Sequence, residues 1–288
     1  MGLAIIHSRA SVGVEAPQVT VEVHISNGMP GFTLVGLPET TVKESRDRVR
    51  SAIIHSRFEF PPKRITVNLA PADLPKEGGR FDLPIALGIL AASEQIISDH
   101  LARYEFLGEL ALSGKLRAVK GVLPAALAAG QVKRCLVVPH ENGDQAALVG
   151  KDQHHSAGSL QEVCQALCGE LSLGLYQSEP QKCSPVSPRD LQDIIGQQQG
   201  KRALEIAAAG HHNLLFLGPP GTGKTMLASR LCDLLPEMSD EEAMETAAVA
   251  SLTQQDIHQY NWKQRPFRAP HHSSSMAALV GGGSIPRP

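Results

Sequence analysis

The stretch Gly218-Pro219-Pro220-Gly221-Thr222-Gly223-Lys224-Thr225 decides the fold of the second half of the chain. It satisfies the phosphate-binding pattern G-x-x-x-x-G-K-[ST] at every fixed position. The apolar residues 213–217 (NLLFL) before it predict a short buried strand, and the spacing of apolar residues in 225–235 predicts a helix. A strand, a glycine-rich loop and a helix in this order are typical of a nucleotide-binding P-loop fold.

The residue types of this loop suit a triphosphate and its magnesium ion. Glycines allow the backbone N–H groups to face phosphate oxygens, and the N-terminus of the following helix adds partial positive charge. Lys224 would reach the β- and γ-phosphates, and the Thr225 hydroxyl would bind Mg²⁺. The sequence therefore predicts an ATP site formed by all eight residues. The alternative is a plain glycine- and proline-rich turn.

The composition is that of ordinary globular domains. The 288 residues include 42% apolar residues, 4% aromatic residues, and 27 Lys and Arg against 29 Asp and Glu, so a chain-wide basic surface for nucleic acid is excluded. Five cysteines without a C-x-x-C pair argue against a disulfide framework or a cysteine zinc site and fit a reducing compartment. The apolar start, residues 1–6, is too short for a secretion signal or a membrane span. We expect a cytoplasmic protein with no membrane partner.

A stretch rich in proline and serine, residues 177–188 (QSEPQKCSPVSP), predicts a linker between domains at 1–176 and 189–288. In the first domain, strand-like runs at 19–25, 32–37, 65–69 and 135–138 alternate with helix-like runs at 41–55, 82–92, 124–129 and 159–171. This alternation predicts an α/β or α+β domain. In the second domain, residues 238–252 predict a helix with Ser239 as its N-cap.

Two stretches of the first domain, residues 76–82 (KEGGRFD) and 108–123 (GELALSGKLRAVKGVL), resemble the signature stretches of the Lon protease domain. In active Lon-type proteases the first stretch carries a serine nucleophile and the second a lysine base. When the patterns are overlaid, Arg80 falls at the nucleophile position and Leu123 at the base position. The resemblance implies an α+β domain of the Lon-like, ribosomal S5-like fold that lacks the catalytic dyad.

The second domain resembles AAA+ ATPases at two further stretches. Residues 190–197 (DLQDIIGQ) resemble the adenine-binding box, which implies base contacts by Ile194, Ile195 and Gly196. The alternative for this stretch is a helix entry with the two isoleucines in the core. Residues 265–275 (RPFRAPHHSSS) and 279–283 (LVGGG) resemble the segment between Walker A and Walker B in the magnesium-chelatase-like branch. Together with the Lon-like domain, these stretches resemble the ComM/YifB family.

That resemblance implies a ring, as a hexamer, that uses ATP and Mg²⁺ to move branched DNA during recombination in natural transformation. No run of four apolar residues followed by Asp-Glu occurs after Lys224, so no catalytic residue is assigned. We therefore expect the first part of an AAA+ domain in a truncated module that binds ATP without hydrolysing it alone. Two alternatives are a metal-insertion motor like magnesium chelatase and a binding module that does not hydrolyse ATP. The Lon-like domain favours the DNA motor over the metal-insertion motor.

The helix predicted at 41–55 carries candidate residues for contact with DNA, branched or single-stranded. Three cations recur on it at helical spacing: Lys43, Arg46 and Arg50. Asp47 interrupts the positive charge and Glu44 is spaced to pair with Arg48, so a solvated helix face is the alternative. Three more cations would extend the surface if the fold brings them close: Lys63, Arg64 and Arg80.

The chain also contains three pairs of adjacent histidines, at 154–155, 211–212 and 271–272. Neighbouring side chains of a helix or strand point apart, and no carboxylate or cysteine lies at ligand spacing. We expect structural or polar roles for these histidines. The only metal contact predicted is that of Thr225 with the magnesium ion of ATP.

Overall fold

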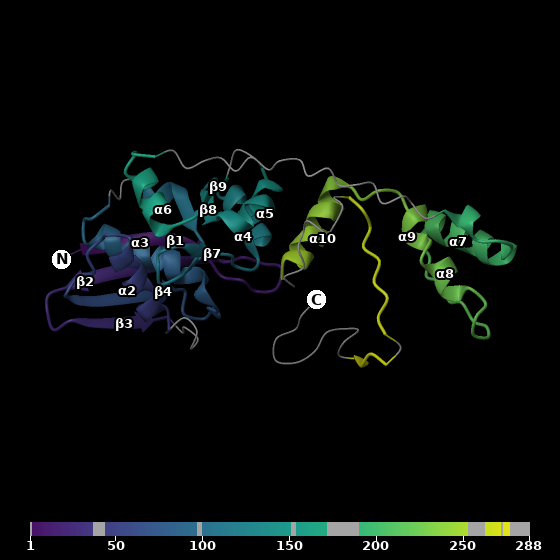
Figure 1. Ribbon diagram of the computed structural model, residues 1–288, viewed down its shortest axis with the longest axis horizontal. Coiled ribbons are helices and arrows are strands. Elements are labelled where there is room, and N and C mark those ends of the chain that lie inside the picture. The colour runs from purple at the N-terminus through teal and green to yellow at the C-terminus, as the bar shows by residue number, and fades with distance from the viewer. Residues whose placement is uncertain are drawn as a thin grey trace. The chain divides into compact units, whose positions relative to one another are not determined.

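The computed structural model describes residues 2–36, 44–96, 100–150, 154–171, 190–252, 263–271 and 273–276. The chain divides into two compact units (Figure 1). Unit 1 comprises residues 1–180 and 248–255, and unit 2 comprises residues 181–247 and 256–288. The linker predicted at 177–188 lies outside the described residues. No helix of the described part is long and apolar enough to cross a membrane.

Unit 1 is built on a mixed sheet of seven strands in the order β3-β4-β2-β1-β5-β8-β9. The strands are β1 (Gly2–Arg9), β2 (Gln18–Ser26), β3 (Gly31–Val35), β4 (Arg64–Ala70), β5 (Tyr104–Phe106), β8 (Cys135–Pro139) and β9 (His154–Ala157). Antiparallel pairing joins β1 to β2 and β2 to β4, whereas the other four neighbouring pairs are parallel. A separate hairpin pairs β6 (Glu109–Leu110) with β7 (Leu116–Arg117). The mixed sheet with accompanying helices confirms the α/β or α+β class predicted from the alternating runs.

The antiparallel strands bury one face and leave the other exposed. Every second residue of β2 is buried, as are the alternate residues of β4 that pair with it: Val19, Val21, Val23, Ile25, Ile65, Val67 and Leu69. On the opposite face of β1, Leu3 and Ile5 are 66% and 48% exposed. The alternation of apolar and polar residues along these strands is therefore explained by a sheet that is covered on one face only.

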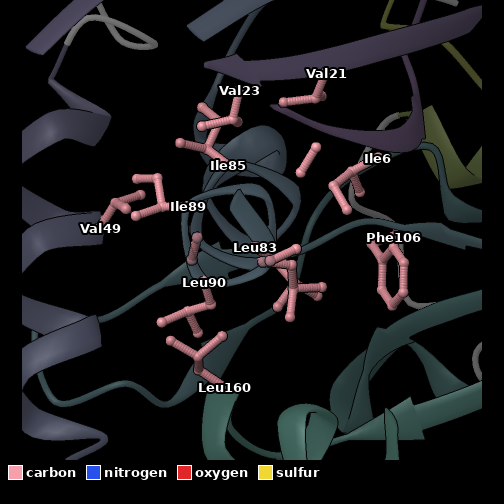
Figure 2. Close-up of a cluster of buried hydrophobic side chains, with 14 of the residues drawn as sticks. Ile6, Val21, Val23, Val49, Leu83, Ile85, Ile89, Leu90, Phe106 and Leu160 are labelled. Carbon is pink, nitrogen blue, oxygen red and sulfur yellow. The ribbon is translucent and has the colours of Figure 1, made fainter. Parts of the chain in front are cut away.

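In the described residues of this unit, the following helices accompany the sheet: α2 (Ser45–His55), α3 (Asp82–Ala92), α4 (Val122–Gln131), α5 (Gly143–Ala147) and α6 (Leu160–Leu167). All eleven residues of α3 are buried, as expected for a helix that is apolar on every side. Figure 2 shows its side chains among residues of β1, β2, β5, α2 and α6. The cluster includes Leu83, Ile85, Ile89 and Leu90 of α3 with Ile6, Val21, Val23, Val49, Phe106 and Leu160.

The parallel part of the sheet is covered on both faces. In β8, Val137 belongs to the core around α3, whereas Leu136 and Val138 pack with α4 and α5 in a second core. Burial on both sides explains why residues 135–138 form a continuous apolar run without alternation. Beside this region, Arg9 Nε lies 2.6 Å from Glu105 Oε2 in an ion pair whose side chains are 7% and 0% exposed.

Unit 2 contains a 3₁₀ turn, η4 (Leu191–Asp193), and the helices α7 (Gln198–Gly210), α8 (Lys224–Ala228) and α9 (Leu231–Leu234). The single helix predicted at 225–235 is thus two short helices. The helix predicted at 238–252 is α10 (Asp240–Leu252), whose residues 248–252 are assigned to unit 1. Ser239 caps it as predicted, since Ser239 Oγ accepts a hydrogen bond from the backbone N–H of Glu242 at 3.1 Å.

The strand predicted at 213–217 is wrong, because these residues are not in regular structure. Leu215 and Leu217 are 78% and 86% exposed. A strand needs a neighbour for its backbone groups, and the described residues of unit 2 include no second strand. Residues 213–217 are apolar enough to form a strand, but the described residues of this unit provide no strand with which they could pair.

Candidate nucleotide-binding site

The glycine-rich loop before α8 contains glycines in the left-handed region of backbone conformation. Gly221 and Gly223 have φ angles of +81° and +84°, in the left-handed region that side chains disfavour. A Cβ at either position would meet no atom within 4 Å, so conformation and not crowding requires glycine here. The loop therefore keeps its backbone open to an approaching ligand.

Lys224 starts α8, and its side chain turns back over the loop. Its Nζ donates hydrogen bonds to the carbonyl oxygens of Pro219 at 2.6 Å and Gly218 at 2.8 Å, and lies 3.4 Å from Thr222 Oγ1. No carboxylate of the described residues forms an ion pair with it. An ammonium group held only by neutral acceptors can exchange them for phosphate oxygens, which bind it more strongly. The residues present therefore fit a triphosphate.

Residues 190–197 contact this loop. Asp190 and Asp193 close the turn at η4 through reciprocal side-chain bonds, with Asp193 Oδ2 accepting from the Asp190 N–H at 3.1 Å. Gln197 Nε2 donates to the carbonyl oxygen of Thr222 at 3.2 Å. Arg230 lies between α8 and α9. Its Nη2 is 3.5 Å from Asp193 Oδ2, and its Nε donates a hydrogen bond to the Asp190 carbonyl oxygen at 3.3 Å. The structure thus joins the predicted adenine-binding box to the phosphate loop.

The three residues predicted to line the base differ in their surroundings. Ile194 is 6% exposed and packs with Leu204 and Leu227 in the small core of unit 2. Ile195 is 97% exposed, and Gly196 has a φ of +73°. Core packing, the alternative reading, therefore describes Ile194, whereas Ile195 and Gly196 are on the accessible side. Contact with adenine stays a prediction.

Sequence reasoning missed the contributions of Gln197 and Arg230. Gln197 is the last residue of the predicted adenine-binding box, and its bond to Thr222 spans 25 residues. Arg230 belongs to no motif, and only the fold brings it to Asp193. The spacing of Asp190 and Asp193, typical of a capping box, was the one local signal for the turn.

In unit 1 the structure places the two Lon-like stretches side by side. Arg80 Nη2 donates to the carbonyl oxygen of Lys120 at 2.6 Å, three residues before Leu123. Arg80 is 5% exposed and burial lowers its pKa to about 10, while Leu123 is fully buried in α4. A guanidinium group at the nucleophile position and an alkyl group at the base position cannot form a serine-lysine dyad. Because Arg80 points inward, its predicted place on a DNA-binding surface is wrong.

Arg48 has a different partner from the one its spacing predicts. Its Nε and Nη2 donate to Asp82 Oδ2 at 2.7 Å and Oδ1 at 3.1 Å, so the ion pair with Glu44 expected from the sequence is replaced by one to α3. The Asp82 side chain is fully buried and also accepts from the Leu110 N–H at 3.2 Å. Burial raises the pKa of Asp82 to about 6, although Arg48 opposes this shift.

The other cations proposed to contact DNA are on the surface. Arg46 and Arg50 of α2 are exposed, as are Lys63 and Arg64 at the start of β4. Lys43 lies outside the described residues. The structure therefore leaves the predicted basic stripe accessible where it is described.

His154 has the structural role expected for the histidine pairs. It is 2% exposed, its Nδ1 accepts from the Leu136 N–H at 3.3 Å, and burial lowers its pKa to about 4. Among the residues that the structure describes, no group of three or more His, Cys, Asp and Glu side chains is arranged to hold a metal ion.

Comparison with known families assigns both units to one class. A family model described as magnesium chelatase, subunit ChlI, matches residues 190–288, and one described as subunit ChlI of Mg-chelatase matches residues 21–142. Part of the chain is also similar to a protease: the archaeal Lon protease of Archaeoglobus fulgidus is 35% identical over 72 residues, which are 25% of this chain and 12% of that protein. The class is therefore that of magnesium-chelatase-related proteins with a Lon-like domain.

Several relatives match the whole chain, including the following two. The competence protein ComM of Haemophilus influenzae is 63% identical over 292 aligned residues, and the uncharacterized protein YifB of Escherichia coli is 57% identical over 291. Each match covers 100% of this chain and 57% of the relative. The chain belongs to the ComM/YifB family and spans little more than half the length of these relatives.

Proposed function

We propose that this chain is the ATP-binding part of a ring-forming DNA motor that promotes branch migration of recombination intermediates in natural transformation. The observation that carries the proposal is the Lys224 ammonium group held over an open GPPGTGKT loop, in a chain 63% identical to a competence protein. The ring, a hexamer, would form from further copies of the chain. The protein would act in the cytoplasm.

The phosphate loop would bind ATP with Mg²⁺. The phosphates would be surrounded by backbone groups of the first six loop residues: Gly218, Pro219, Pro220, Gly221, Thr222 and Gly223. Lys224 would bind the β- and γ-phosphates, and Thr225 would hold the metal ion. In the complete motor, bound ATP would supply the free energy for movement through hydrolysis of its γ-phosphate. Gln197 would position the loop through Thr222, next to Ile195 and Gly196 on the side of the base.

The Lon-like domain would contact DNA or organise the ring and would not cleave peptides. Support comes from Arg80 and Leu123, which stand where the dyad of a Lon-type protease would be. A protonated guanidinium group has no free lone pair, so Arg80 cannot be a nucleophile. We infer that the fold is retained in this family as a scaffold.

A metal-insertion motor is the second candidate, because both units match models of a magnesium chelatase subunit. The experiment that separates the two is ATP turnover by the full gene product in the presence of a four-way DNA junction, linear duplex or a porphyrin with Mg²⁺. The DNA motor predicts stimulation by the junction and movement of its branch point. Turnover that depends on porphyrin and ignores DNA would replace the proposal with the second candidate.

A further inference from the structure

Exposed cations that form no ion pair within the described part of the chain lie along α2 and the connection from α2 to β4. Five residues form this group, which we name the basic strip: Arg46, Arg50, Arg57, Lys63 and Arg64. By contrast, seven other arginines of the described residues form ion pairs: Arg9, Arg48, Arg117, Arg134, Arg202, Arg230 and Arg265. The cations of the strip are therefore free to bind an external anion.

The strip is positive in a chain that is negative overall. Residues 44–64 contain six arginines and lysines and three acids, Glu44, Asp47 and Glu59, whereas the whole chain has a formal net charge of −2. Arg48, the sixth cation, is neutralised by Asp82. A local positive field on a protein that is negative overall attracts polyanions to that place.

A stacking contact joins the two parts of the strip. The guanidinium carbon of Arg50 lies 5.5 Å from the centre of the Phe60 ring, so the helix and the connection meet at this point. Lys63 and Arg64 follow Phe60 by three and four residues, a distance of at most about 14 Å in an extended chain. Phosphates of one strand rise by about 3.4 Å per nucleotide along the axis of a DNA helix, and each cation of the strip can contact one of them.

Hydrogen bonds fix the backbone of the connection. Gln95 Oε1 accepts from the Glu59 N–H and Gln95 Nε2 donates to the Glu59 carbonyl, each at 2.8 Å. The Phe58 N–H donates to the Ile53 carbonyl of α2 at 3.1 Å, and Arg64 is paired in register with Ser26 of β2. Binding would thus order side chains but no backbone, which lowers the entropic cost.

We propose that the basic strip binds the phosphate backbone of DNA without reading its sequence. This inference rests on the proposed function and names the surface of the Lon-like domain that the DNA would contact. Side chains of Arg and Lys that meet phosphates position a nucleic acid but carry no base specificity. Arg80, which points into the domain, is not part of the strip.

The test compares two variants of the 288-residue chain with equal change in charge. The strip variant carries Arg46→Gln, Arg57→Gln, Lys63→Gln and Arg64→Gln and keeps Arg50 on Phe60. The control variant carries four changes at other exposed cations without an ion pair: Arg103→Gln, Lys115→Gln, Lys120→Gln and Lys133→Gln. Fluorescence anisotropy gives Kd for a labelled single-stranded DNA and for RNA of the same sequence over a salt series, after thermal melting confirms an unchanged Tm.

We expect the strip variant to bind DNA at least about tenfold more weakly than wild type at about 100 mM salt, with a slope of log Kd against log salt about 3 smaller. The control variant retains both values. If the strip variant does not fold, Lys63→Gln with Arg64→Gln gives about half the change in slope.

Equal DNA binding by the strip and control variants would refute the proposal that the basic strip contacts DNA. The proposed DNA motor would be unaffected. Absence of DNA binding by wild type would overturn the DNA partner itself. A loss confined to RNA would assign the strip to RNA and refute the proposal.

Discussion

The buried carboxylate of Asp82 gives the protein a pH dependence that a single substitution removes. Asp82 links the first turn of α3 to Arg48 of α2 and to the backbone of Leu110. In Asp82→Asn the group no longer titrates, while Arg48, whose side chain is 23% exposed, can regain water. The difference in unfolding free energy between wild type and variant therefore isolates the titration of this one carboxyl group.

The magnitude follows from the two pKa values of Asp82. Its pKa is about 6 in the folded protein against 3.8 for the unperturbed group, and desolvation is the largest cause. A raised folded pKa means that the folded state takes up the proton first, so the contribution to stability is present below pH 3.8 and is lost as the pH rises through about 6. When the pH is lowered from about 7.5 to about 4, the unfolding free energy of wild type should rise by about 2 kcal/mol relative to that of Asp82→Asn.

Urea unfolding followed by circular dichroism at a series of pH values measures this difference. Other titrating groups, including His154, are common to both proteins and cancel. A difference that stays constant with pH would refute the assigned pKa. A difference that falls on acidification would show that the ion pair with Arg48 outweighs desolvation.

Three further predictions concern the core of unit 1. Glu105→Ala should cost about 3–5 kcal/mol in urea unfolding because it leaves the Arg9 cation buried without its partner, and a loss below about 1 kcal/mol would show that the pair is solvated. Ile89→Ala, at a fully buried position of α3, should cost about 2–5 kcal/mol, and an unchanged midpoint would contradict the packing in Figure 2. Cys164 is 1% exposed and burial raises the pKa of its thiol to about 12, so a thiol reagent at neutral pH should label the partly exposed Cys135 first. Mass spectrometry of the labelled peptides checks this, and equal labelling would count against it.

The elements that could be predicted from the sequence are those in which one hydrophobic pattern runs through the whole segment. Alternation in 19–25 and 65–69 identified β2 and β4, and the helix-like run at 82–92, apolar after Asp82, predicted the bounds of α3. β1 escaped prediction because residues 1–6 were read only as an apolar start too short for a membrane span. The strand at 213–217 was wrong because an apolar run does not say whether a pairing partner exists.

The candidate site, too, has features that could be predicted from the sequence and features that could not. The phosphate loop is local, so its eight residues were predicted from the motif alone. Contacts made across the chain were not: Gln197 with Thr222, Arg48 with Asp82, and the inward turn of Arg80 all depend on elements that the sequence places far apart. Charge spacing on α2 identified Arg46 and Arg50, but their continuation through Arg57 became visible only with the fold.

The most direct test of the account is equilibrium binding of a fluorescent ATP analogue to residues 1–288, with and without Mg²⁺, for wild type, Lys224→Ala and Lys201→Ala. Lys201 lies on α7 of the same unit and serves as the matched control. We expect binding that Mg²⁺ strengthens, that Lys201→Ala preserves and that Lys224→Ala abolishes, with unchanged circular dichroism in both variants. Binding that survives Lys224→Ala would contradict a nucleotide site at the GPPGTGKT loop.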